Sequence, residues 1–387
     1  MTIYYITNGR IPNPRAYGIH IVKMCEALAS KGAKVTLVAQ KRKNMVGPDL
    51  FEYYSVPKVF DVLYLPIFDA VELDWRGGFW INQISFSFRL FFTSIFGDKR
   101  EYVVIARDEV SAFVLSLRGC RVFYDMHGFP VRSFWFWRLM LRRVDGIIVT
   151  NTWKKKQCEE VFGISPRKII ILPNGFDERF FENETGGTVS LQELGIPKGA
   201  PSVLYTGHLY DWKGVYVLAE AASLLPEVYF VFVGGTPWDV ASFRERYQKD
   251  KNIIVLGHKP YASVPSYLRV ASILVLPNSQ FSKSLRHEVF SRYDTSPIKL
   301  FEYMASGKPI IASDLPSIRE IVSEKDVFFV KPDSPEELAS CIRRLLVDSG
   351  FAERIAKQAK EDSKRYTWEK RAEKMLEFVK IKIKDKK

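Results

Sequence analysis

Apolar and polar positions follow one another along the chain in a repeating strand–helix–strand pattern. Apolar runs at 3–7 and 35–39 flank residues 21–29, whose apolar side chains fall on one helical face. Parallel strands need a crossover helix between them, so this pattern predicts a parallel sheet. Further apolar runs predict four more strands, at 103–106, 121–124, 146–150 and 169–172.

A second series begins after the turn signal Pro173-Asn174-Gly175 and a polar, glycine-containing stretch. Strands are predicted at 203–206, 229–233, 253–256, 273–276 and 309–312. Helical patterns are found at 214–225, 239–249, 297–306, 335–347, 351–365 and 368–385. The fold class is therefore α/β, with two doubly wound Rossmann-like domains facing across a cleft, and ligands are expected at the carboxyl ends of the strands.

This reading divides the chain into four parts. Residues 1–172 form the first domain, 173–200 a linker, 201–366 the second domain and 367–387 a final helix. A length of 387 residues fits two domains better than one.

Composition indicates the general class of the protein but not its substrate. Hydrophobic residues make up 47% of the chain and charged residues 26%, which is typical of a globular protein. The net charge of +13 favours anionic partners. Four scattered cysteines fit a reducing compartment, and neither a signal peptide nor an apolar run of about 18 residues is found. We therefore expect a cytoplasmic protein, or one peripheral to the inner face of a membrane.

The strongest chemical signal is the stretch DTSPIKLFE at 294–302. Ser296 is a good helix N-cap and Pro297 suits the first helical position, so a helix with an anion-binding start is expected there. Asp294 would precede this helix, and Glu302, in its second turn, could accept hydrogen bonds from a vicinal diol such as a ribose. The alternative is a well-capped helix with one solvated acid.

This stretch resembles the donor-site motif of retaining GT-B-fold glycosyltransferases, in particular glycosyltransferase family 4. The family motif has two glutamates separated by seven residues. Glu302 matches the second, and the shorter acid Asp294 stands at the first. The resemblance implies that the donor-binding residues include Ser296, Pro297, Ile298, Lys299, Leu300 and Glu302.

Other segments resemble the same family. The loop GHLYDWKG, which begins at Gly207, is similar to the loop that contacts the diphosphate, with Lys213 at the lysine position and His208 where an arginine is usual. His127 matches a histidine that lies beside the donor sugar, and Gly18 partly matches a glycine-rich loop. The resemblance also implies that the helix after 367 crosses back onto the first domain.

The resemblance implies transfer of a hexose-type sugar from a UDP- or GDP-linked donor to a glycan or lipid-linked acceptor, with retention of configuration. Lys213, the helix start and His208 would stabilise the departing diphosphate, while Asp294 and His127 would orient the sugar. Catalytic roles thus fall to His127, Asp294 and Lys213. No metal or other cofactor is expected, because the nearest DxD-like sequence, at 72–74, is unremarkable.

Two aromatic segments are unusual. Residues 129–143 carry four arginines and no acid, and residues 79–96 contain seven aromatic residues and one charge. Such segments suit an anionic membrane surface, and a lipid-linked acceptor would explain them. The alternative is that most of these aromatic side chains pack against the first sheet.

Competing functions remain open on the sequence. A sugar-nucleotide epimerase or hydrolase of the same fold, and a catalytically silent nucleotide-binding partner protein, both fit the pattern. A dehydrogenase fits less well because no GxGxxG follows the first strand. Nucleic acid is not an expected partner, because the basic residues are dispersed and no recognised motif is present.

Overall fold

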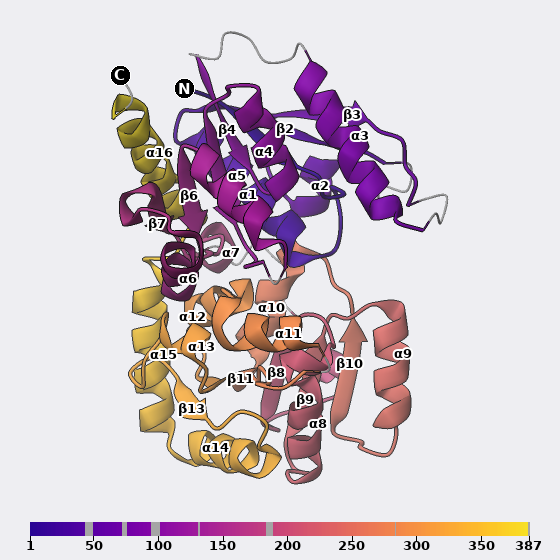
Figure 1. The fold of residues 1–387 in the computed structure, drawn as a ribbon. Coiled ribbons are helices and arrows are strands. Elements are labelled where there is room, and N and C mark those ends of the chain that lie inside the picture. Colours follow the sequence, from indigo (N-terminus) through magenta and orange to yellow (C-terminus); the bar gives the residue numbers. More distant parts are fainter. Residues whose placement is uncertain are drawn as a thin grey trace. The chain divides into compact units, whose positions relative to one another are not determined.

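The computed structural model describes residues 1–42, 49–71, 76–93, 101–130, 132–182, 189–282 and 284–385. The chain divides into two compact units, one formed by Met1–Pro173 with Trp368–Lys387 and the other by Asn174–Thr367. Each unit is an α/β domain built on a parallel sheet (Figure 1).

The first unit contains a seven-stranded sheet in the order β3-β2-β1-β4-β5-β6-β7. Its strands are β1 (Thr2–Thr7), β2 (Lys34–Lys41), β3 (Asp61–Pro66), β4 (Tyr102–Ala106), β5 (Val122–Met126), β6 (Gly146–Val149) and β7 (Ile169–Ile171). The sheet is doubly wound, because β1 pairs with both β2 and β4 and the strand order reverses there.

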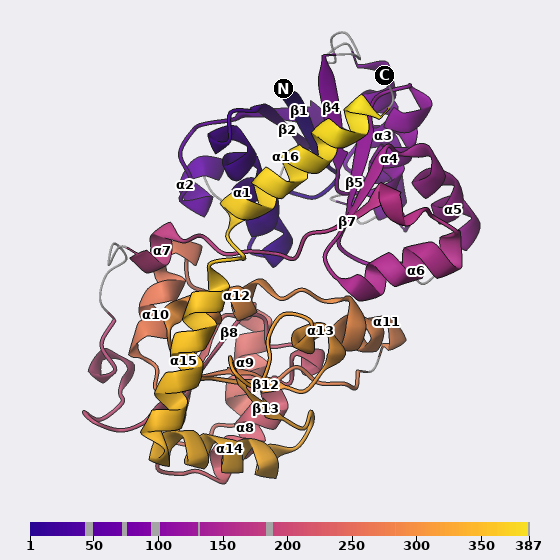
Figure 2. The same ribbon diagram turned by 90° about the vertical axis from the view of Figure 1, so that its left-hand side faces the viewer.

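Helices cover both faces of this sheet. They are α1 (Ala16–Ser30), α2 (Leu50–Tyr54), α3 (Gly78–Phe92), α4 (Glu109–Leu117), α5 (Phe134–Arg143), α6 (Thr152–Phe162) and α16 (Trp368–Lys384). Buried residues of α3, α4, α5 and α6 share one core with the strands, so these four helices cover one face. The C-terminal helix α16 packs against α1 within the same unit (Figure 2).

The second unit contains a six-stranded sheet in the order β10-β9-β8-β11-β12-β13. Its strands are β8 (Ser202–Thr206), β9 (Tyr229–Val233), β10 (Ile253–Gly257), β11 (Ile273–Leu276), β12 (Ile310–Ser313) and β13 (Phe328–Val330). The strand order reverses between β8 and β11, which pair in parallel.

The helices of the second unit are α7 (Arg179–Glu182), α8 (Val215–Ser223), α9 (Pro237–Arg246), α10 (Val264–Val270), α11 (Leu285–Val289), α12 (Ile298–Ser306), α13 (Pro316–Arg319), α14 (Pro335–Val347) and α15 (Ser349–Ser363). One core joins α8, α9 and α14 to the sheet, and a second joins α10, α12, α13 and α15 to its other face. The prediction of two doubly wound α/β domains is confirmed.

The structure differs from the sequence reading at some elements. Two edge strands, β3 and β13, were not predicted. The described part of the segment expected as a linker belongs to the second unit from Asn174 onward, and Ile196 is buried in its core. In the part of the chain that the structure describes, no helix is both long and apolar enough to cross a bilayer.

Candidate functional site

The start of α12 presents backbone N–H groups that no side chain caps. The helix begins at Ile298, one residue later than predicted, because Pro297 is extended with ψ of 119°. Ser296 is not the N-cap: its hydroxyl accepts a hydrogen bond from the backbone N–H of Asn174, and its carbonyl accepts one from the Asn174 amide. An uncapped helix start carries partial positive charge and favours an anion.

Lys299 lies in the first turn of this helix and carries a buried ammonium group. Its Nζ sits 3.8 Å from the centre of the Tyr205 ring, and within the described residues it has no hydrogen-bond partner. Burial lowers the pKa of Lys299 well below its usual value, repulsion from Lys213 lowers it further, and Glu302 opposes the shift. A buried ammonium without a carboxylate partner is costly, so this position is suited to an anionic ligand.

Lys213 contributes a second cation to the same cluster. It ends the single turn Asp211–Lys213 that precedes α8, and its Nζ lies 3.9 Å from the centre of the Trp212 ring. Burial lowers the pKa of Lys213 to about 7. Two neighbouring ammonium groups repel each other, and a diphosphate between them would remove that repulsion.

Glu302 lies one turn deeper in α12 and is buried. Burial raises the pKa of its carboxyl group to about 7, while the hydrogen bond from Tyr261 and the charge of Lys299 work against that rise. Its remaining lone pairs can accept hydrogen bonds from a ligand diol. The structure therefore places the uncapped helix start and the deeper acid on the same helix, and their binding of an anion and a diol stays a prediction.

The backbone around this cluster lies where the strand order reverses. Gly207 follows β8 with a φ of +127°, and a Cβ there would come within 2.8 Å of Lys299 Nζ. The absence of a side chain at Gly207 therefore leaves room for the ammonium group. Asn278 follows β11 and is fully buried, with neither amide atom hydrogen bonded to a described residue.

The other predicted residues are placed as follows. Asp294 is buried at the end of the irregular turn Phe290–Asp294 that precedes α12. The ring of His208 stacks on Tyr210, with centroids 4.9 Å apart and an angle of 6° between the planes. Leu300 is buried in the core, and its backbone N–H donates to the carbonyl of Pro297.

Gly18 and His127 belong to the first unit. Gly18 is the third residue of α1, and a Cβ there would meet the Tyr54 hydroxyl at 2.2 Å, so its glycine is required for packing. His127 follows β5 directly, as predicted, and its Nε2 lies 3.2 Å from Asp125 Oδ1.

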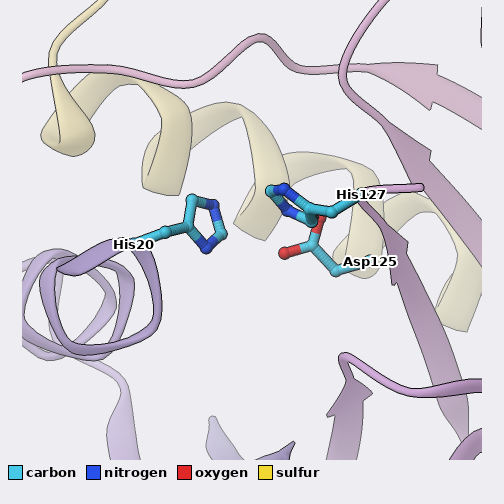
Figure 3. A group of neighbouring side chains, drawn as sticks. All are labelled: His20, Asp125 and His127. Carbon is cyan, nitrogen blue, oxygen red and sulfur yellow. The ribbon is translucent and has the colours of Figure 1, made fainter. Parts of the chain in front are cut away.

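Asp125 is the centre of a buried charge network at the carboxyl end of the first sheet (Figure 3). Its two oxygens accept hydrogen bonds from Tyr5 and from Arg371 of α16, and Arg107 lies 3.5 Å away. Burial works to raise the pKa of Asp125, but Arg371, His127 and Arg107 outweigh it and hold the pKa well below its usual value.

His20, on α1, faces His127 and Asp125 in the same group (Figure 3). The two rings meet edge to face with centroids 4.2 Å apart, and neither ring nitrogen of His20 has a hydrogen-bond partner among the described residues. Burial, followed by repulsion from Arg107, lowers the pKa of His20 well below its usual value and that of His127 to about 3. Both rings are therefore neutral at physiological pH.

Side chains of His20, Asp125 and His127 lie close enough to share a cation. Such a cation would have to displace Arg371 from Asp125 and would be repelled by Arg107. This group therefore fits a buried ion-pair network better than a metal site. The DxD-like residues Glu72 and Asp74 lie outside the described residues.

Several residues of these two clusters were not predicted from the sequence. Asp125 is an acid inside the apolar run VFYDM, and a buried acid must find a cation, so a partner could have been expected. Nothing local identifies Arg371 as that partner, since it lies 246 residues away. The unpartnered Asn278 has no distinguishing pattern around it.

Two family models match the chain. Residues 18–180 match the model described as Glycosyltransferase Family 4, and residues 188–362 match Glycosyl transferases group 1. The matches leave out only residues 1–17, 181–187 and 363–387.

Among curated relatives, D-inositol 3-phosphate glycosyltransferase of Xylanimonas cellulosilytica is 26% identical over 60% of this chain and 56% of its own length. The UDP-Gal:alpha-D-GlcNAc-diphosphoundecaprenol alpha-1,3-galactosyltransferase of Escherichia coli is 23% identical over 59% of this chain and 60% of its own. The aligned part thus spans somewhat more than half the length of these relatives.

Among solved structures, HepE of Anabaena in complex with UDP superposes with a TM-score of 0.73 at 16% identity, covering 98% of this chain and 100% of that one. This similarity concerns the fold. The similarity shows the GT-B fold, and the two family models show that the chain belongs to glycosyltransferase family 4.

Proposed function

We propose that this protein transfers a hexose-type sugar from a UDP- or GDP-linked donor to a glycan or lipid-linked acceptor, with retention of configuration. The observation that supports the donor most strongly is the ammonium group of Lys299, which has no hydrogen-bond partner among the described residues and lies in the first turn of the uncapped helix α12. A diphosphate would supply the negative charge that both groups lack. The E. coli relative is named for a UDP-linked donor and a diphosphoundecaprenol-linked acceptor, and HepE was solved with UDP.

In this proposal, Lys213, Lys299 and the amides of α12 stabilise the departing diphosphate. These donors are already in place before the reaction, which is the arrangement that lowers a barrier most effectively. Glu302 accepts hydrogen bonds from the ribose. The orienting roles of Asp294 and His127 stay predictions from the resemblance, as does a same-face displacement that needs no divalent metal.

Replacing Glu302 tests the ribose contact. We expect Glu302→Ala to weaken UDP or GDP binding about 10- to 100-fold, because hydrogen bonds to a charged group contribute roughly 1.5–3 kcal/mol. Isothermal titration calorimetry of the full chain measures this loss. The control is Glu353→Ala, an exposed acid on α15. Unchanged affinity in Glu302→Ala would remove Glu302 from the donor site.

Binding of the diphosphate should take up protons. In the free protein Lys213 has a pKa of about 7, so at pH 8 it is mostly neutral. A bound diphosphate raises that pKa, so affinity is greatest below pH 7 and falls as the pH rises above it. At pH 8 we expect UDP binding to take up about one proton through Lys213.

Calorimetry in buffers of different ionisation enthalpy measures this uptake. In the variant Lys213→Met, proton uptake on UDP binding should fall by the part that Lys213 contributes, and the fold should be unchanged. A binding enthalpy that is the same in all buffers would contradict a diphosphate beside these lysines.

Acceptor dependence separates the proposal from the related activities. An epimerase or hydrolase consumes the nucleotide sugar without a sugar acceptor. A catalytically silent binding protein does not consume the nucleotide sugar at all. The expected outcome is donor consumption that requires an added glycan or lipid-linked acceptor.

A further inference from the structure

The helix α3 exposes most of its large apolar side chains to solvent and buries two polar side chains, Asn82 and Gln83. Its exposed residues include Trp80, Ile84 and Phe88, which are 60%, 65% and 63% exposed and follow one another at helical spacing. Phe79, Phe91 and Phe92 widen this exposed face. The expectation that most of these aromatic side chains pack against the first sheet is therefore wrong for α3, where only Phe86 among the described aromatics is buried.

Hydrogen bonds hold α3 in this orientation. The buried side chain of Asn82 accepts from the backbone N–H of Ala70 and donates to Asp69, and the buried side chain of Gln83 donates to Asp108. Turning the helix over would bury Trp80 and Phe88 but would break these bonds and leave buried polar groups unsatisfied. The exposed apolar stripe is thus a fixed feature of the first unit.

The neighbouring helices on the same side of the sheet also expose apolar side chains. The helix α4 lies between α3 and α5 and contacts both (Figure 1). On α5, Trp135 is 75% exposed, and Phe134 and Leu139 are exposed as well. Leu117 at the end of α4 is also exposed. An apolar area of this kind on a protein surface marks an interaction site.

The charged side chains of α3 and α5 are all basic, and the one acid of α4 is Glu109 in its first turn. Neither α3 nor α5 contains Asp or Glu. Exposed arginines lie on both helices, at Arg89, Arg138, Arg142 and Arg143. A second copy of the same face would bring these arginines together, so a symmetric dimer through it is disfavoured.

We propose that the exposed face of α3, α4 and α5 binds an anionic lipid bilayer, with the aromatic side chains in the interface and the arginines at the head groups. Aromatic residues and arginines are the side chains that favour this boundary, and a helix that lies in the plane of the interface does not need the length to span the membrane. The proposal rests on the first unit alone and does not depend on the proposed donor or acceptor.

Sedimentation with vesicles tests the surface without any measurement of activity. The full chain should sediment with vesicles of equal parts phosphatidylcholine and phosphatidylglycerol, and more weakly with phosphatidylcholine alone. The variant Trp80→Ser/Ile84→Ser/Phe88→Ser should bind the mixed vesicles about tenfold more weakly or worse, because each large apolar side chain contributes substantially when it leaves water.

A matched control comes from the second unit. Trp238, Phe281 and Val347 are 77%, 63% and 86% exposed, so Trp238→Ser/Phe281→Ser/Val347→Ser removes similar side chains elsewhere and should bind as the unaltered protein does. The variant Arg89→Gln/Arg143→Gln should lose binding to the mixed vesicles but little of the binding to phosphatidylcholine.

Three results would overturn the proposal. One is failure of the unaltered chain to sediment with mixed vesicles at low salt. Another is equal binding by the α3 variant and the control variant. The third is a dimer that the α3 substitutions dissociate, without vesicle binding, because the face would then serve a second copy of the chain.

Discussion

Replacing Lys299 by methionine should reduce sugar transfer by about 10²- to 10³-fold, the loss that follows removal of one preorganised donor to a departing negative charge. Methionine keeps most of the apolar stem that packs against Tyr205 but cannot donate to a phosphate oxygen. The same change should not weaken the fold. The pKa of Lys299 is lower in the folded state than in the unfolded chain. The unfolded chain therefore binds the proton of Lys299 more tightly, so this lysine destabilises the folded state at pH 7.

Lys299→Met is therefore expected to melt at the same temperature as the unaltered protein or higher, while losing transfer and diphosphate binding. The control is Lys308→Met, which removes a half-buried lysine at the other end of α12. It should leave UDP binding unchanged. Normal turnover in Lys299→Met would show that the diphosphate does not depend on this ammonium group.

Replacing Asp125 by asparagine should destabilise the first unit by about 3–5 kcal/mol, because it leaves two buried guanidinium groups without a countercharge. Arg371 would lose the contact that joins α16 to the carboxyl end of β5. Urea unfolding followed by circular dichroism measures the change. If the asparagine variant unfolds at the same urea concentration as the unaltered protein, the network does not hold α16.

A second substitution separates charge from packing. In Asp125→Asn/Arg371→Met one of the two unpaired cations is removed, so the double variant should be less destabilised than the sum of the two single changes. The pH dependence has a definite sign. The folded-state pKa of Asp125 is lowered, so its contribution is present above about pH 4 and is lost as the pH falls below that value.

Local patterns were enough to predict the fold and the start of the candidate site. The alternation of apolar runs with helical periods identified the central strands, since these are buried on both faces. Pro297 placed the start of α12 to within one residue, because proline fits the beginning of a helix. The strands β3 and β13 were missed, although the other edge strands, β7 and β10, were predicted from their apolar runs.

Long-range pairing was beyond these patterns. Ser296 does not cap α12, because its hydroxyl accepts a hydrogen bond from the backbone N–H of Asn174, which is distant in the sequence. The surroundings of the Lys299 ammonium group likewise include Gly207, which is distant in the sequence. The orientation of α3 was hidden for the same reason. The side that faces the sheet is set by the core packing of Phe86 and Leu90 and by the hydrogen bonds of Asn82 and Gln83.

Crystals of the full chain soaked with UDP and with GDP test the central claim most directly. We expect diphosphate oxygens at hydrogen-bond distance, about 3 Å, from the ammonium groups of Lys213 and Lys299 and from the first amides of α12, with the ribose against Glu302. A nucleotide bound elsewhere in the second unit, with both ammonium groups left unoccupied, would contradict it.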